Sequence, residues 1–273
     1  MRPTGKRSNT RRTTLLALAV TVLLVSMTGV RPVRALDVFT LWNQPEIPLN
    51  LVEGAWVEYQ MQVMAGGRQE TGLTRVVCLG RDKDTWLLEL LPLDEAEDGA
   101  RTPVPGEGAQ LRLSVAALES RGHLLDAVVE AVQWRNGVAE NVSLAELRND
   151  PLVAASLDSE FRPQETEEED PTTRVISTRQ FLCRQFVMSA ADTQSVDLPA
   201  GRMVQVTTRE ISAAVNAEIP FLGVAYAAER IRSDSHLDPP SDRMGPPPPR
   251  IRVEVMELVG LGTGATAVLV AVD

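Results

Sequence analysis

Apolar and polar residues alternate along much of the chain with the period of two that is typical of β-strands. In residues 57–63, Val, Tyr, Met and Val alternate with Glu and Gln, which predicts one buried side and one side facing water. Gly66-Gly67 and residues 81–84 are turn signals between such runs. Strand-like runs in the first half occupy residues 57–63, 71–79, 86–91 and 111–115. This spacing predicts an antiparallel meander, with residues 94–108 as an exposed loop before its fourth strand.

The second half repeats the pattern. Its strand-like runs occupy residues 173–178, 179–189, 202–211, 213–216, 251–258 and 268–272. Met203 to Thr208 is rich in the β-branched residues that strands favour. The glycines of Gly260-Leu261-Gly262-Thr263-Gly264 predict a flexible hairpin turn between the last two strands.

The middle of the chain is ambiguous. Residues 124–132 fit a helix by their apolar stripe and a strand by their valine content, and periodicity leaves both open. Ser143 with Glu146, and Asp150 before Pro151, resemble helix starts, which predicts short helices at 143–149 and 151–158. The fold class that follows is mostly β, a curved antiparallel sheet or half-barrel with short helices packed on it and only a minor α+β character.

The first 35 residues have the layout of a secretory signal peptide. A basic leader precedes an apolar stretch at 15–27, and Val33-Arg34-Ala35 gives small residues at −3 and −1 of a cleavage point. Thr10-Arg11-Arg12-Thr13 also resembles a twin-arginine signal. We therefore expect export to the periplasm or the exterior, with an uncleaved amino-terminal membrane anchor as the alternative. Residues 36–273 are then a single β-rich domain with no transmembrane segment, an acidic loop near 162–171 and a Pro-rich loop at 239–249.

Charge narrows the range of partners. The 273 residues carry 27 Lys and Arg against 37 Asp and Glu, a net charge of −10. Seven of the basic residues lie in the signal, so the remainder has 20 against 37, a net charge of −17. This balance argues against nucleic acid as a partner, because phosphate binding needs a dense cationic face. Two His and two Cys are too few for a zinc ribbon, and we expect neither a metal nor a cofactor.

Cys78 and Cys183 lie in two separate expected strands of an exported chain. A disulfide between them would close a loop of roughly 100 residues and stabilise the fold by about 4–5 kcal/mol in the chain-entropy model. The alternative is two separate buried thiols, and spacing alone does not decide between them. The chain has no Cys-x-x-Cys pair for redox chemistry.

The remaining candidates for chemistry are weak. Ser235-His236 with Asp234 and Asp238 is a hydrolase hypothesis, but triad members meet in space rather than in sequence, so a solvated His236 is favoured. His123 lies near a turn. The glycines at 260–264 lack the spacing of a dinucleotide fingerprint, and the acidic cluster at 165–170 lacks the ligand spacing of a calcium loop. We therefore expect no enzyme activity.

The segment around Pro220 is the most informative for binding. Pro220 interrupts a strand pair and brings four apolar residues together in a turn: Ile219, Phe221, Leu222 and Val224. This corner either plugs the core or lines a groove for an apolar, lipid-like ligand, and the plug is favoured.

The carboxy-terminal half resembles a group of exported bacterial proteins of unassigned activity. The resemblance rests on Leu198-Pro199-Ala200-Gly201, the corner Ile219-Pro220-Phe221-Leu222-Gly223, Met256-Glu257-Leu258 and Gly262-Thr263-Gly264-Ala265. It covers residues 198–267, and the Pro-rich loop is an insertion relative to the group. More distantly, the strand-rich layout looks like the half-barrels of periplasmic lipoprotein carriers, whose concave sheet holds acyl chains.

Two hypotheses of function follow. The first is an exported, non-enzymatic protein that binds an apolar or lipid-like ligand between sheet and helices, near Phe221 and Leu222. The second is an interaction or scaffold protein of an envelope assembly, which docks partners through its acidic and Pro-rich loops.

Overall fold

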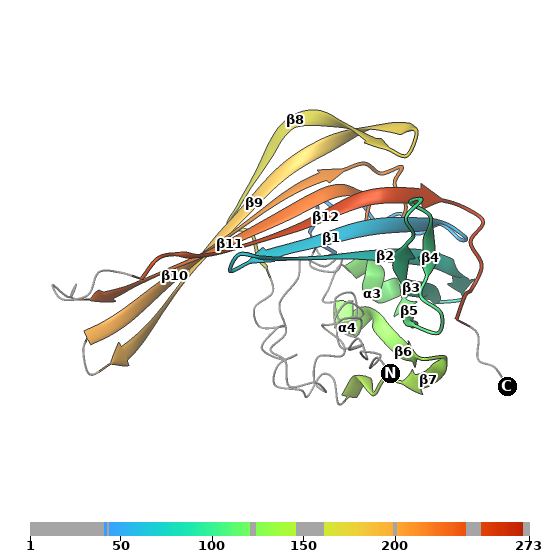
Figure 1. Cartoon of the computed structure of the whole chain (residues 1–273), viewed down its shortest axis with the longest axis horizontal. Helices are drawn as coiled ribbons and strands as arrows, with labels where there is room; N and C mark the ends of the chain where they lie inside the picture. Colours follow the sequence, from blue (N-terminus) through green and yellow to red (C-terminus); the bar gives the residue numbers. More distant parts are fainter. Residues whose placement is uncertain are drawn as a thin grey trace, which may run out of the picture.

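Twelve β-strands form one sheet in the computed structural model, which describes residues 41–42, 44–120, 124–145, 161–198, 201–238 and 247–269 (Figure 1). The strands are β1 (Trp56–Ala65), β2 (Arg68–Asp82), β3 (Thr85–Glu95), β4 (Arg101–Pro103), β5 (Gly108–Ser114), β6 (Val128–Arg135), β7 (Val138–Asn141), β8 (Glu165–Ile176), β9 (Arg179–Leu198), β10 (Gly201–Val215), β11 (Val224–Asp238) and β12 (Arg250–Gly262). Two short helices accompany them, α3 (Val115–Ser120) and α4 (Leu124–Ala127).

Every strand pair is antiparallel, and the order across the sheet is β7-β6-β5-β3-β2-β1-β12-β11-β10-β9-β8, with β4 added to the end of β3. The sheet is curved, and β7 and β8 are its two edges (Figure 1). This confirms the predicted fold class of a curved antiparallel sheet with short helices packed on it. In the described part of the chain, no helix is long and apolar enough to cross a membrane.

The period of two produces a continuous apolar face, here called the inner face, which packs against α3, α4 and residues 41–50. Cross-strand neighbours on this face match one another in register. One row crosses five strands through Met61, Met256, Ala227, Ala213 and Phe186, and a second pairs Cys78 of β2 with Leu88 of β3 and Leu111 of β5. Because the side chains in each row lie close together, they bury one another and fix the register.

The opposite, outer face has a smaller apolar cluster formed by Val77, Leu91, Trp134 and Leu269. Leu269 comes from residues 263–269, which follow β12 without strand structure and return across the sheet. The predicted strand at 268–272 is therefore wrong over the residues described. The predicted hairpin turn at 260–264 is also wrong, because β12 continues to Gly262.

Gly260 and Gly262 have a packing role within β12. A Cβ on Gly260 would lie 2.7 Å from Glu58 Oε2, and one on Gly262 would lie 2.6 Å from the Trp56 ring. Only glycine leaves space for these two side chains of β1 to lie across the neighbouring strand.

Four strands extend past the body of the molecule as a twisted ribbon, here called the arm (Figure 1, left). It consists of residues 190–198 of β9, 201–209 of β10, 231–238 of β11 and 250–252 of β12. The partners of β9 and β12 on the other side end near the base of the arm, where β8 begins opposite Ser189 and β1 ends opposite Arg252.

The acidic segment is a strand and not the predicted loop. β8 begins at Glu165 and pairs with β9 through most of its length. Glu and Pro are tolerated because β8 is an edge strand whose residues 165–171 are exposed, and a register shift between Glu169 and Thr172 accommodates Pro171.

The ambiguous segment 124–132 contains both structures. α4 ends at Ala127, and β6 begins at Val128. The predicted loop at 94–108 contains β4, which pairs with β3. The signal at 1–35, His123, most of the helices predicted at 143–149 and 151–158, and residues 239–246 of the Pro-rich loop lie outside the described residues.

Candidate functional site

The corner between β10 and β11 is fastened to the amino-terminal segment by backbone hydrogen bonds. Asn50 and Phe221 each donate a backbone N–H to the other's carbonyl at 2.7 Å. The Asn50 side-chain amide also donates to the Ala217 carbonyl at 2.9 Å. Tyr59 donates its hydroxyl to the Val224 carbonyl at 3.1 Å, and burial raises the pKa of this phenol well above its usual value. The corner is therefore fixed from two other elements.

This corner is part of the packed core. Ile219, Leu222 and Val224 are 0% exposed and Phe221 is 2% exposed. Phe221 adopts a left-handed φ of 69°, which costs free energy in a residue with a Cβ. The four predicted groove residues lie in one core cluster with the apolar residues of the inner face, which is the core-plug arrangement.

A band of four charged residues crosses the inner face where the body meets the arm. Arg209 of β10 donates from Nε to Glu229 Oε1 at 2.7 Å, and Arg252 forms an ion pair with Glu254. Both glutamates are almost fully buried, and they are direct cross-strand neighbours on β11 and β12. Like charges in this position repel, so each carboxylate needs its own arginine. We call these four residues the charged band. The sequence pattern did not predict it, because alternation does not show which residue of another strand lies beside a glutamate.

At the tip of the arm, the two faces differ in chemistry. On the inner side, the register places Val196, Met203 and Leu237 side by side across three strands. Val196 is 55% and Met203 is 37% exposed. The outer side instead has ion pairs, Arg202 with Asp197 at 2.9 Å and Arg232 with Asp234 at 2.8 Å. Between the charged band and this row, the inner side of the arm is polar: Thr207 contacts Ser233 at 3.2 Å, and Gln205 lies between Gln194 and Ser235. The row is therefore a separate apolar surface at the tip of the arm, and water reaches it.

Comparisons with known proteins do not assign a family. No family model matches the chain, and no curated protein matches it. A LolA superfamily protein from Nitrosomonas europaea matches with 8% identity, over 94% of this chain and 98% of that one, at a TM-score of 0.25. A domain named for outer membrane lipoprotein sorting, from Vibrio parahaemolyticus, matches with 8% identity over 77% of this chain and 84% of its own, at a TM-score of 0.28. A DUF1329 family protein from Desulfovibrio piger has 11% identity, 92% coverage of both chains and a TM-score of 0.27.

These matches agree with the resemblance stated for the sequence, to exported bacterial proteins and lipoprotein carriers. At these TM-scores they assign no function.

The two cysteines are separate thiols. Cys78 and Cys183 are both buried and free. Their strands β2 and β9 are five positions apart in the sheet, about 24 Å along it, whereas a disulfide needs Cα atoms within about 7 Å. Burial raises the pKa of Cys78 to about 12 and also raises that of Cys183, on which nearby Arg174 acts in the opposite direction. Of the two alternatives, the structure has the unpaired one.

The hydrolase hypothesis fails on strand geometry. Ser235 and His236 are consecutive residues of β11, so their side chains point to opposite faces of the sheet. Asp234 is bound to Arg232, which lowers the pKa of the carboxyl group by hydrogen bonding. Within the described ranges, no group of three or more His, Cys, Asp or Glu has the arrangement of a metal site.

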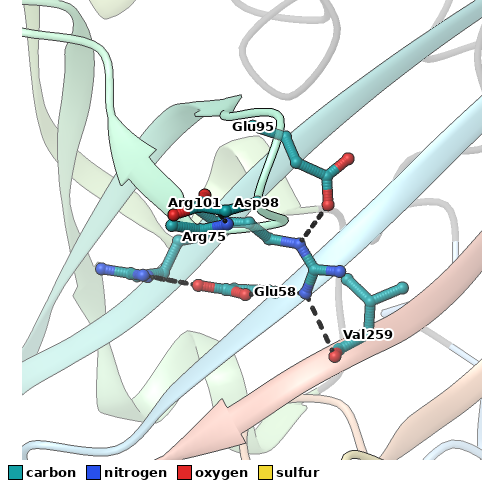
Figure 2. Close-up of polar contacts among 7 residues, drawn as sticks. Glu58, Arg75, Glu95, Asp98, Arg101 and Val259 are labelled. Carbon is teal, nitrogen blue, oxygen red and sulfur yellow. Dashed lines mark hydrogen bonds and ion pairs between the residues drawn. The ribbon is translucent and has the colours of Figure 1, made fainter.

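A second ion cluster lies on the outer face and holds the β3–β4 hairpin (Figure 2). Glu58 accepts a hydrogen bond from Arg75 Nε at 2.9 Å, and Arg101 Nη1 lies 3.3 Å from its other oxygen. Arg101 also contacts Glu95 and the Val259 carbonyl, so it joins β4 to β1 and β12. Alternation predicted Glu58 on a wet face, but it is 4% exposed because Arg75 and the hairpin's Arg101 lie against it. The cluster is fully ion-paired, and we interpret it as structural.

Proposed function

We propose that this chain is an exported, non-enzymatic binding protein that holds an apolar, lipid-like ligand on the inner face of its sheet. The single observation that carries the proposal is the difference between the two faces at the tip of the arm. Val196, Met203 and Leu237 expose an apolar row on the inner face, while the outer face of the same strands bears ion pairs. Export rests on the signal-like residues 1–35.

The apolar row is a surface that a ligand would stabilise. Val196 is more than half exposed and Met203 more than a third, and the neighbouring residues Asp197 and Arg202 form an ion pair on the other face. Covering apolar surface contributes about 25 cal/mol per Å², so an acyl chain lying along the row removes area from both molecules. The corner at 219–224 is already filled, so we place the ligand on the arm and not beside Phe221 and Leu222.

The charged band affects how a ligand with a polar end would be oriented on the arm. Arg209 and Arg252 are each balanced by a buried glutamate, so the band is neutral as a unit. Their side chains are 20% and 21% exposed, which leaves N–H groups at the boundary between core and arm. Gln205 and Thr207 lie on the inner face of β10 between the band and the row. A ligand with a polar end and an apolar tail would place its tail on the row and its polar end over these residues, toward the band.

The test compares two neighbouring residues of β10. Met203→Asp introduces a charge on the inner face, and Val204→Asp introduces the same charge on the outer face of the same strand. Protein purified from the exported fraction is analysed by native mass spectrometry and by solvent extraction. Bound acyl species should be lost from Met203→Asp and kept by Val204→Asp. Recovery of wild-type protein without any bound apolar species, or equal loss from both variants, would refute the proposal.

The alternative function, an interaction protein of an envelope assembly, is favoured by the edge strand β8. All of residues 165–171 are exposed, and five of these seven residues are Glu or Asp. Edge strands with free backbone groups pair with extended partner segments. Replacing the four glutamates at 165 and 167–169 with serine should then release a defined partner from cross-linked cell envelopes. An unchanged cross-linking pattern would count against it.

A further inference from the structure

Residues 263–269 are held on the outer face by side chains rather than by strand pairing. Glu89 of β3 accepts hydrogen bonds from the backbone N–H groups of Val268 and Leu269, both at 2.9 Å, through its two oxygens. Gln110 of β5 lies opposite Glu89 in register and donates to the Leu269 carbonyl at 2.8 Å. One backbone hydrogen bond also holds this segment, called the tail below: Ala265 donates its N–H to the Gly54 carbonyl. Figure 1 shows the tail leaving the end of β12 and passing the β2–β5 region.

The tail has one anchoring side chain. Leu269 is 6% exposed and packs with Val77, Leu91 and Trp134. Gly108 makes room for it, because a Cβ there would lie 2.7 Å from Leu269 Cδ1. Residues 266–268 are exposed, so the apolar contact is concentrated in this residue.

Glu89 is a buried carboxylate that depends on the tail for most of its hydrogen bonds. It is 0% exposed, and it accepts hydrogen bonds from uncharged N–H groups, two from the tail and one from Gln110. A buried carboxylate is costly unless its oxygens accept hydrogen bonds, so most of this compensation comes from the tail. The indole N–H of Trp134 is likewise buried, and among the described residues it has no hydrogen-bond partner. Glu89 and Gln110 bind the backbone of the tail, and the pocket beside them holds one aliphatic side chain. These are the elements of a peptide-binding site.

The tail is joined to the sheet by a short, exposed connection. Thr263 and Gly264 are exposed, and Gly264 has a left-handed φ of 80° with nothing within 4 Å of where its Cβ would be. The bonds that hold the tail involve only residues 265–269. A tail from another molecule would present the same backbone groups and the same leucine to the site.

We propose that Glu89, Gln110, Gly108 and the Leu269 pocket form a peptide-binding site, and that this site binds the tail of a second copy of the chain as well as its own. The ligand is an extended segment with two free backbone N–H groups and a bulky aliphatic residue. Within one molecule, the covalent connection gives the chain's own tail a concentration advantage, so exchange requires an empty site and a free tail.

The first experiment empties the site. A chain ending at Gly262 is titrated with a synthetic peptide of residues 263–273, and tryptophan fluorescence reports binding because Trp134 lines the pocket. Saturable binding is expected. The Glu89→Gln substitution should weaken it by about ten-fold or more, and Leu269→Asp in the peptide should abolish it. Glu130→Gln is the matched control, because Glu130 lies on the neighbouring strand β6 and pairs with Arg112.

The second experiment tests exchange between copies. The truncated chain has an empty site, and the full-length Glu89→Gln chain has a weakened site, so its tail is free for a larger fraction of the time. Each should be monomeric alone, and their mixture should contain a 1:1 complex by native mass spectrometry. If a truncated chain with cooperative urea unfolding binds no peptide, or if Glu89→Gln binds it as tightly as wild type does, the proposal is overturned.

If truncation prevents folding, a protease site placed at 263–264 of the full-length chain replaces it. After cleavage, labelled peptide should exchange into the folded protein. Failure of the label to enter would equally overturn the proposal.

Discussion

Gly223 lets Pro48 and the backbone of Asn216 pack closely against the corner at 216–224. Replacing this glycine with alanine therefore measures how tightly the corner is packed. A Cβ on Gly223 would lie 2.3 Å from Pro48 Cγ and 2.8 Å from the Asn216 carbonyl oxygen. The residue also has a left-handed φ of 64°. Two costs therefore add, about 1 kcal/mol for the backbone conformation and about 2 kcal/mol for overpacking. We expect Gly223→Ala to lower the free energy of unfolding by about 3 kcal/mol.

Gly67 provides the matched control. Its φ is 76°, and nothing lies within 4 Å of where its Cβ would be, so Gly67→Ala should cost only about 1 kcal/mol. Urea unfolding of both variants, followed by tryptophan fluorescence and far-ultraviolet circular dichroism, gives the difference with the m-value as a check on two-state behaviour. If the two variants differ by less than about 0.5 kcal/mol, the corner is not packed as described.

Two further predictions concern buried ionisable groups. Glu58→Gln should lower the free energy of unfolding by about 2 kcal/mol because two arginines lose their buried partner, while Glu95→Gln, at a 45% exposed side chain, should change it by less than about 0.5 kcal/mol; equal effects in urea unfolding would contradict the assignment. Both thiols should resist maleimide at neutral pH in the native protein and react once it is unfolded; rapid native labelling of Cys78 would show that its site is open. Since burial raises the Cys78 pKa to about 12 from a usual value near 9, the unfolded thiol loses its proton between these pH values while the folded one keeps it. The free energy of unfolding therefore falls as pH rises through this window, by at most about 1.4 kcal/mol per unit for this group, and Cys78→Ala should reduce the slope.

The sequence predicted the inner face well and the outer face poorly. Val57, Tyr59 and Met61 alternate with polar residues, and the buried side of β1 is the predicted one. Glu58 defies the same rule, because its burial depends on Arg101, which is 43 residues away and reaches it through a hairpin that alternation does not foresee. Period two identifies two faces of a strand, but it does not report whether a second layer covers the polar one.

The candidate sites depend even more on distant parts of the chain. Glu89 lies within a run that predicts a strand, and its partner Leu269 is 180 residues later. A lone glutamate inside an apolar strand was the available signal for that site. The acidic residues at 165–170 were predicted as a loop because their composition is unusual for strands, and an exposed edge is the place where that composition is tolerated.

The place of β12 beside β1 has a consequence for how the molecule is made. β2 to β7 lie on one side of this central pair and β8 to β11 on the other, so the pair joins the two halves of the sheet. Trp56 pairs with Gly262 across about 200 residues of chain. Contacts of such long sequence separation slow folding, because the entropy of closing the chain is lost before the strands bond. The centre of this sheet therefore cannot form until β12 has been synthesised. A molecule without β12 would have two unjoined halves, with exposed strand edges at β1 and β11.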